Sequence, residues 1–269
     1  MAAAVAAIEL AESTLPLRVL DVGTGAGGAL GHLARRVRAA SRDEDGTVVA
    51  VDIDARAIEV ARVQLDDLRL ERLVDLRVAD LHAIAAEASA TGSAFDLIWS
   101  SDTVWPASFD DPAAVVRALA GALVPGGTLA LFTTNYYQSM FLPGHSRLER
   151  LIRTASELTW GLPHDGQAHY ERLGAWMRQA GLSDVTLRVF PVVASTLAEP
   201  AARTFLEQIV WPEMRRAVAS HGRAAGMNDA DIARAEELLD PASPAWVGTD
   251  PDGFVVQPTL LWTGRSTAV

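Results

Sequence analysis

The chain has 269 residues, of which 49% are hydrophobic and 21% charged, and it carries a formal net charge of −11. This composition is ordinary for a globular protein and excludes the fibrous and disordered classes. The absence of cysteine excludes disulfides, thiolate catalysis and cysteine-ligated metals, and the absence of lysine excludes Schiff-base chemistry. The acidic balance argues against a nucleic-acid partner, because such affinity rests on cationic contacts.

The sequence contains no signal for secretion or membrane insertion. No apolar run reaches the ~18 residues that a transmembrane helix needs. Residues 1–13 lack the basic region of a secretion signal and are expected to form a short amphipathic helix. We therefore expect a cytoplasmic protein with no membrane partner.

Strand and helix patterns alternate along the first half of the chain. Short apolar runs bounded by turn residues predict strands at 17–22, 46–53, 74–80, 95–101 and 126–133. Apolar residues spaced three and four apart predict helices at 27–37, 55–68 and 112–123. Asp54 and Asp111 are placed as helix N-caps, with Pro112 at a first helical position. This order predicts an α/β fold with a parallel, doubly wound sheet.

The alternation is less regular after residue 133. Residues 134–165 surround one helical stretch with turn residues, and we expect them to form an insertion over the carboxyl edge of the sheet. Residues 195–250 are expected to hold at least two helices, one interrupted at Pro212 and one begun by Asn228 or Asp229. Both segments are predicted to serve as a lid that binds the substrate, within a single domain spanning residues 1–269.

Two more strands complete the predicted sheet. Alternating apolar residues predict strands at 183–192 and 254–264, and residues 167–180 have a helical pattern. Pro258 lacks the N–H that a central strand needs, so strand pairing is expected to begin after it or to be bulged there.

The stretch VLDVGTGAGG at 19–28 carries the most chemical information. Gly23, Gly25 and Gly28 satisfy the GxGxxG pattern of dinucleotide-binding turns, and Asp52 follows at about the distance of a ribose-binding acid. Asp21 argues against a pyrophosphate, because its carboxylate would repel an anion and attract an ammonium or a sulfonium. Gly28 is then interpreted as a helix-packing residue.

The series of motifs resembles the class I S-adenosylmethionine-dependent methyltransferases of the small-molecule type. That family has an acid and three alternating glycines after the first strand, an acid after the second that binds the ribose, and an Asp after the third that contacts the adenine. The resemblance implies a Rossmann-like, mostly parallel seven-stranded sheet with the last strand antiparallel. It also implies a cofactor site formed by Asp21, Val22, Gly23, Thr24, Gly25, Gly27, Asp52, Ile53, Asp80, Leu81, Ser100 and Ser101.

Three functions remain open from the sequence. The first is methyl transfer from S-adenosylmethionine to a small molecule, with S-adenosylhomocysteine as the product. The second is a cofactor-binding protein without catalysis, which serves regulation or assembly. The third is an NAD(P)-dependent oxidoreductase, which is disfavoured by Asp21 and by the lack of a lysine for a Tyr-x-x-x-Lys pair. Asp80 is equally suited to a simple turn after its strand.

The methyl acceptor is expected to be apolar or aromatic, because aromatic side chains are frequent in the predicted lid. Its accepting atom is left open among oxygen, nitrogen and carbon. Candidates for a general base are His164, His169 and Tyr136. Asp102 and Asn135 could offer oxygen ligands, but the paired acids of metal-assisted relatives are missing and no metal is expected. We expect a monomer or homodimer, and the lysine-free composition suggests secondary metabolism.

Overall fold

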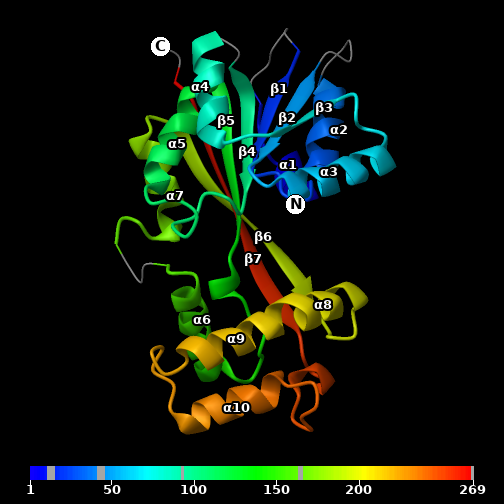
Figure 1. Cartoon of the computed structure of the whole chain (residues 1–269), viewed down its shortest axis with the longest axis vertical. Helices are drawn as coiled ribbons and strands as arrows, with labels where there is room; N and C mark the ends of the chain where they lie inside the picture. Colours follow the sequence, from blue (N-terminus) through cyan, green and yellow to red (C-terminus); the bar gives the residue numbers. More distant parts are fainter. Residues whose placement is uncertain (11–15, 41–45, 92–93, 163–165, 268–269) are drawn as a thin grey trace. The chain divides into compact units, whose positions relative to one another are not determined.

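The computed structural model describes residues 1–10, 16–40, 46–91, 94–162 and 166–267 and divides into two compact units. Unit 1 comprises Met1–Thr133, Tyr170–Phe190 and Leu260–Val269, and unit 2 comprises Thr134–His169 and Pro191–Thr259 (Figure 1). Unit 2 therefore takes in both segments that the sequence predicts as insertions. No helix among the described residues is long and apolar enough to cross a membrane.

One seven-stranded sheet has the order β3-β2-β1-β4-β5-β7-β6. The strands are β1 Arg18–Val22, β2 Thr47–Asp52, β3 Val74–Val78, β4 Phe95–Ser101, β5 Leu123–Thr134, β6 Ser183–Ala194 and β7 Val255–Arg265. The ladders of β1 with β2 and β4, of β2 with β3, and of β4 with β5 are parallel. β7 is antiparallel, since Gly126 N donates to Ser266 O whereas Asn135 N donates to Pro258 O. The predicted α/β fold is confirmed.

Helices cover both faces of the sheet in unit 1 (Figure 1). They are α1 Ala2–Ala6, α2 Leu30–Ala40, α3 Ala55–Leu68, α4 Leu81–Thr91, α5 Pro112–Gly121 and α7 Leu173–Gln179. Successive β1 residues show why two layers are needed, because Val19 packs in the cluster with α1, α2 and α3 whereas Leu20 packs in the cluster with α4, α5 and α7. A strand buried on both faces reads as a continuous apolar run, which is the pattern seen in the sequence.

Some predicted helix boundaries in unit 1 are confirmed and others are wrong. Asp54 and Asp111 cap α3 and α5 by accepting bonds from Arg56 N and Ala114 N. α2 begins at Leu30 rather than at residue 27, because the glycine-rich residues before it form turns. The segment predicted as helical at 167–180 becomes α-helical only at Leu173, after a 3-10 turn at Tyr170–Arg172. The N-terminal helix spans Ala2–Ala6, and the predicted continuation over 11–13 lies outside the described residues.

Unit 2 is mainly helical. Its elements are α6 Ser146–Thr159, α8 Pro200–Phe205, a π turn at Leu206–Val210, α9 Trp211–His221 and α10 Asp229–Leu239, with 3-10 turns at Tyr136–Gln138 and Val247–Thr249. Asn228 is the N-cap of α10 and forms a capping box with Asp231, which settles the alternative between Asn228 and Asp229.

Pro212 does not interrupt its helix as predicted. α8, the π turn and α9 follow one another without a gap, and Pro212 is the second residue of α9. Proline has no N–H to donate to the carbonyl four residues earlier. The wider π turn directly before α9 accommodates this missing bond by a change of winding instead of a helix end.

Pro258 lies within β7 and interrupts the regular pairing there. Val256 exchanges both backbone hydrogen bonds with Met140, and Pro258 pairs with Asn135. The two pairs are therefore two residues apart along β7 but five residues apart along the partner segment. Pairing thus does not begin after Pro258, and the irregularity is the 3-10 turn that intervenes at Tyr136–Gln138. Asn135 O cannot receive the second bond of an antiparallel pair from a proline, and it accepts from Ser139 Oγ at 2.7 Å instead.

Replacing Ser139 by alanine should therefore destabilise unit 2. Ser139 is fully buried, and Ser139→Ala would leave the Asn135 carbonyl without its donor. We expect a loss of about 1–3 kcal/mol in the free energy of unfolding, measured by urea denaturation. Ser220→Ala, at an exposed position of α9, is the control and should change it by less than ~0.5 kcal/mol. Equal stabilities of the two variants would contradict the assignment.

Candidate functional site

The glycine loop after β1 has a backbone that only glycine adopts easily. Gly23, Gly25 and Gly27 have φ values of +69°, +54° and +88°. A Cβ on Gly25 would meet no atom within 4 Å, so the loop is open to a ligand at that position, whereas one on Gly27 would press against Leu30 and Ala61. Gly28 is exposed and would touch nothing nearer than 4.0 Å. Gly27, and not Gly28 as predicted, is therefore the helix-packing glycine.

Hydrogen bonds hold this loop to the end of β2. Gly23 N and Thr24 N both donate to Val51 O, at 2.9 and 3.0 Å. Gly25 N donates to Asp52 Oδ2 at 2.9 Å, while Asp52 Oδ1 accepts from Asp54 N at 2.9 Å. A carboxylate has about four acceptor positions, so Asp52 keeps capacity for two further donors. Asp54, not Asp52, caps the following helix.

Ile53 lies beside Asp52 and is unusually exposed for an isoleucine, at 75%. The end of β3 joins the same edge, because Ala79 N donates to Asp52 O at 3.0 Å. Asp80 is exposed, and its Oδ1 accepts from His82 N at 2.7 Å in the first turn of α4. Asp80 thus has the local structural role that the sequence allowed as an alternative, and its contact with adenine stays a prediction. Leu81, the first residue of α4, is buried in the core.

Asp21 is buried rather than open to solvent, with 1% of its surface exposed. Its Oδ2 accepts from Thr24 Oγ1 at 2.7 Å, so the carboxylate braces the glycine loop from within. Burial raises the pKa of Asp21 from 3.8 to about 7, the hydrogen bond from Thr24 opposes this rise, and the Asp52 charge adds to it. Its predicted attraction for a cationic ligand stays a prediction.

The end of β4 meets the glycine loop from the other side. Ser100 pairs in register with Val22, is 98% buried and has no hydrogen-bond partner for its hydroxyl among the described residues. Ser101 is half-buried. Thr103, which sequence reasoning missed, donates from Oγ1 to Ser101 O at 3.0 Å and lies where a Cβ on Gly23 would fall, so it explains why residue 23 is glycine. Its only sequence signal is a hydroxyl residue shortly after a neighbouring strand.

These residues meet at the point where the strand order reverses. β1 continues to β2 and β3 on one side, and β4 and β5 lie on the other. In doubly wound sheets, ligands bind outside the carboxyl ends of the strands at such a point. Asp21, Thr24, Gly25 and Asp52 are linked there by the hydrogen bonds above, and Ser100 joins them through its register with Val22.

The predicted general bases lie elsewhere in the chain. Tyr136 and His169 belong to unit 2, and His164 lies outside the described residues. Tyr136 packs against Phe205 and Phe141, with ring centroids 6.2 and 6.3 Å apart. His169 is half-buried. The described residues contain no group of three or more His, Asp or Glu side chains arranged to hold a metal ion.

Comparison with known proteins identifies relatives over part of the chain. A family model described as a methyltransferase domain matches residues 15–171. Ubiquinone biosynthesis O-methyltransferase from Xanthomonas axonopodis pv. citri is 33% identical over 171 residues, which cover 61% of this chain and 62% of the relative. The enzyme of that name from Xanthomonas oryzae pv. oryzae is 35% identical over the same coverage. The chain thus spans less than two thirds of the length of these relatives.

Solved structures share the fold at low sequence identity. The YcgJ protein from Bacillus subtilis has a TM-score of 0.53 at 16% identity, covering 98% of this chain and 97% of its own. A methyltransferase candidate from Bacillus halodurans C-125 has a TM-score of 0.53 at 15% identity, covering 96% of each chain.

Asp21→Asn should change stability in a pH-dependent way. Between pH 4 and 7 the unfolded chain has lost the Asp21 proton while the folded chain retains it, so the wild type loses stability as pH rises through this window. Asparagine keeps an acceptor for Thr24 without the charge. We expect equal stability near pH 4 and a gain for the variant that grows to at most about 4 kcal/mol at pH 7 and above.

Urea denaturation at pH 4.5, 6 and 8 measures this gain. Asp66→Asn, on the exposed side of α3, is the control and should show no such trend. A gain for Asp21→Asn that does not depend on pH would contradict the raised pKa.

Proposed function

The chain belongs to the class I S-adenosylmethionine-dependent methyltransferases, and we propose that it transfers a methyl group to a small organic acceptor. The methyltransferase-domain match covers more than half of the chain. The same match favours a methyltransferase over a nicotinamide-dependent oxidoreductase. No comparison supports either the oxidoreductase or a non-catalytic binding protein.

The observation that carries the proposal is the bond from Gly25 N to Asp52 Oδ2. It fixes a partly open carboxylate beside the one glycine of the loop whose Cβ position is empty. The free acceptor positions of Asp52 suit a pair of ribose hydroxyls, and the exposed Ile53 next to it offers an apolar surface for a purine. The residues present therefore fit an adenosine cofactor.

We propose the cofactor site predicted from the sequence, with altered roles for six of its residues. Gly23, Gly25 and Asp52 would face the cofactor, and Ser100 and Ser101 would border it. Asp21 and Thr24 would act by holding the loop, since their side chains bind each other. Val22, Gly27 and Leu81 would act by packing, and Asp80 by ending β3 in a helix cap.

The chemistry needs alignment more than activation. Bound S-adenosylmethionine supplies a methyl group that is already activated by the sulfonium. Gly23, Gly25 and Asp52 would hold the cofactor. A lone pair of the acceptor would then bond to the methyl carbon, and the electron pair of the carbon–sulfur bond would stay on sulfur to give S-adenosylhomocysteine. The protein contributes by orienting the reactants and excluding water. If the acceptor arrives protonated, a general base must remove its proton.

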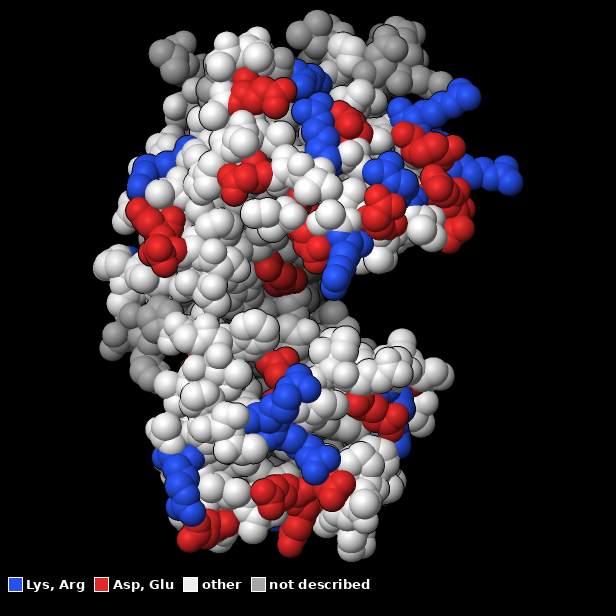
Figure 2. Space-filling model, viewed as in Figure 1, with Lys and Arg blue, Asp and Glu red and all other residues white. Residues whose placement is uncertain are grey.

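We propose oxygen as the accepting atom, because the curated relatives are named as O-methyltransferases. On the face drawn in Figure 2, arginines and acidic residues are both spread over the surface, so this face offers no extended basic surface to a polyanion such as a nucleic acid. We further propose that unit 2 supplies the residues that recognise the acceptor. Cytoplasmic location, a role in secondary metabolism and a monomeric or homodimeric state remain our proposals from the sequence.

Asp52→Ala should weaken S-adenosylmethionine binding by about 1–3 kcal/mol, because both the ribose acceptors and the Gly25 contact are lost. Isothermal titration calorimetry measures the affinity. The matched control is Asp54→Ala, which removes a helix cap next to the site and should leave the affinity unchanged. Unchanged binding in Asp52→Ala would remove Asp52 from the site. If the wild type bound NAD(P) but neither S-adenosylmethionine nor S-adenosylhomocysteine, the proposed function would be wrong.

The base is proposed among His164, His169 and Tyr136. With a protonated acceptor and a histidine as the base, the double variant His164→Ala/His169→Ala should lose about 10²–10⁴-fold in kcat near neutral pH while it binds S-adenosylmethionine normally. Steady-state kinetics with the acceptor found by screening tests this. Full turnover by the double variant would exclude both histidines.

A further inference from the structure

Strand β6 is an edge of the sheet, because the strand order gives it a single neighbour, β7, among the described strands (Figure 1). Its first half, residues 183–189, lies in unit 1. Residues 186–189 are exposed on both faces of the strand. An edge strand presents unpaired N–H and C=O groups, which can serve as a template for a further strand.

One face of this first half of β6 is apolar. Val185 packs partly against the cluster that includes residues of α4, α5 and α7. Side chains two residues apart share a face of a strand, so Leu187 and Val189 continue the face of Val185. These two side chains are 44% and 54% exposed. Apolar side chains in such a row are stabilised when the side chains of another strand lie opposite them.

The opposite face carries two charges of opposite sign. Asp184, Thr186 and Arg188 line the same cavity on this face. Asp184 forms no ion pair with any residue that the structure describes. Arg188 donates to Ala7 O at 2.7 Å and lies 3.6 Å from the exposed Glu9 carboxylate. A guanidinium has five N–H donors, so Arg188 keeps capacity for a further carboxylate.

Two observations show which backbone groups of β6 face outward. Ser266 exchanges backbone hydrogen bonds with β5, so Thr263 faces β6 by alternation, and its hydroxyl lies 2.9 Å from that of Thr186. Thr186 therefore faces β7. Pro191 belongs to the alternate set of β6, and a proline is tolerated in a strand where its missing N–H would face solvent. The odd-numbered residues of β6 thus present their N–H and C=O groups to a further strand.

The sequence of β6 is complementary to itself. In an antiparallel pair centred on Thr186 of two copies, Asp184 lies opposite Arg188 of the second copy, and the two-fold symmetry repeats this contact. On the other face, Val185 lies opposite Leu187 of the second copy. One register therefore matches both the charged and the apolar side chains.

Neighbouring registers match less well. A pair centred on Arg188 sets two guanidiniums opposite each other, and one centred on Leu187 sets Thr186 opposite Arg188 of the second copy. The register centred on Thr186 also keeps residues 184–188 between Asp184, whose φ is +49°, and Pro191, which are the two points where β6 departs from a regular strand.

We propose that β6 pairs with β6 of a second copy in this register, which gives a two-fold symmetric homodimer with one sheet continuous through both copies. The contact is short against a standard interface, so we expect a Kd on the order of 10–100 µM. The cofactor site does not depend on it, because Asp52 ends β2, near the opposite edge of the sheet.

Sedimentation equilibrium over concentrations that span this Kd tests the association. The wild type should follow a monomer–dimer equilibrium. Leu187→Asp places a charge on the apolar face, and Asp184→Arg sets arginines opposite each other, so each should weaken the dimer at least about tenfold. The controls are Val63→Asp on α3, where the valine is 63% exposed, and Asp252→Arg, which makes the same charge change at an exposed position outside β6. Both should dimerise like the wild type.

Cross-linking tests the register, because the chain contains no cysteine. Residue 186 faces β7, so the two copies of it would form a pair without backbone hydrogen bonds, with Cα atoms about 4.5 Å apart. A disulfide spans that distance, and Thr186→Cys should oxidise to a covalent dimer. Val189→Cys is exposed on the same strand but should not cross-link, because the two copies of residue 189 would lie about 20 Å apart along the strands.

The proposal is overturned if the wild type stays monomeric throughout, if Leu187→Asp or Asp184→Arg dimerises as tightly as the wild type, or if Val189→Cys cross-links as readily as Thr186→Cys. All the replaced side chains are exposed, so each variant should keep the circular dichroism spectrum of the wild type. Each should also keep its affinity for S-adenosylmethionine, and a monomeric variant that lost this affinity would contradict the independence of the site from the dimer.

Discussion

The hydrogen bond between Gly25 N and Asp52 Oδ2 is the constraint on which the candidate cofactor site depends. It joins the loop after β1 to the end of the neighbouring strand, so the positions of both are set together. The left-handed glycines make that path possible, and Thr103 packs beneath the first of them. Asp52 also accepts a hydrogen bond from Asp54 N, so two backbone N–H groups hold its carboxylate. Its remaining lone pairs therefore point in a defined direction.

The parts of the fold that local chemistry determines could be predicted from the sequence. Apolar runs located the strands, since a strand covered on both faces has no polar alternation, and the side chains of Asp54, Asp111 and Asn228 located three helix starts. Helix α4 was missed because alanine dominates it and blurs any apolar stripe. The packing role of Gly27, the burial of Asp21 and the bond from Ser139 to Asn135 O depend on residues from other elements, which periodicity does not report.

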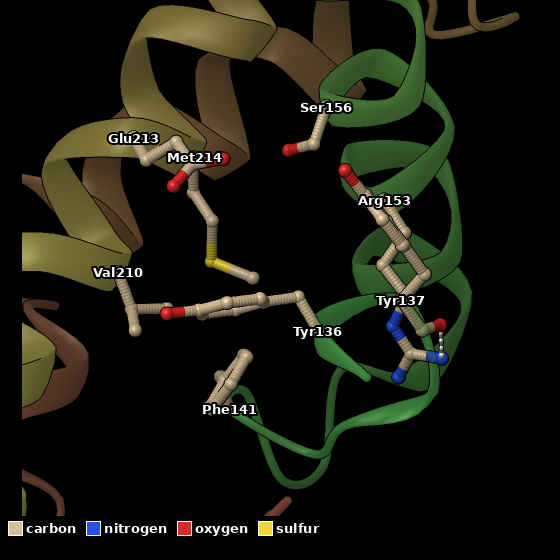
Figure 3. Close-up of a pocket in the computed structure, with 8 residues that line it drawn as sticks. All are labelled: Tyr136, Tyr137, Phe141, Arg153, Ser156, Val210, Glu213 and Met214. Atoms are coloured by element: carbon tan, nitrogen blue, oxygen red, sulfur yellow. Dashed lines mark hydrogen bonds between the residues drawn. The ribbon is translucent and has the colours of Figure 1, made fainter. Parts of the chain in front are cut away.

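The charged residues of unit 2 also differ in what the sequence alone reveals about them. Glu149 and Glu213 lie in helices α6 and α9 of unit 2. The structure buries Glu149 and surrounds it with donors, namely Arg153, Phe141 N and Leu142 N. Glu213 accepts one hydrogen bond, from the indole N–H of Trp160, and lines a small pocket (Figure 3). Neighbours that only folding brings together therefore make Glu149 a structural carboxylate, which the periodicity of its helix does not report.

The π turn at Leu206–Val210 has a consequence for how this chain diverges from its relatives. A π turn amounts to one residue more than an α-helix of the same rise, and each residue of an α-helix turns its axis by about 100°. Because the extra residue is taken up within the turn, deleting one residue there would restore regular winding and leave the residues that follow, Glu213 and Met214 included, close to their present orientation. Relatives can thus differ by a one-residue insertion or deletion at this turn without displacement of α9.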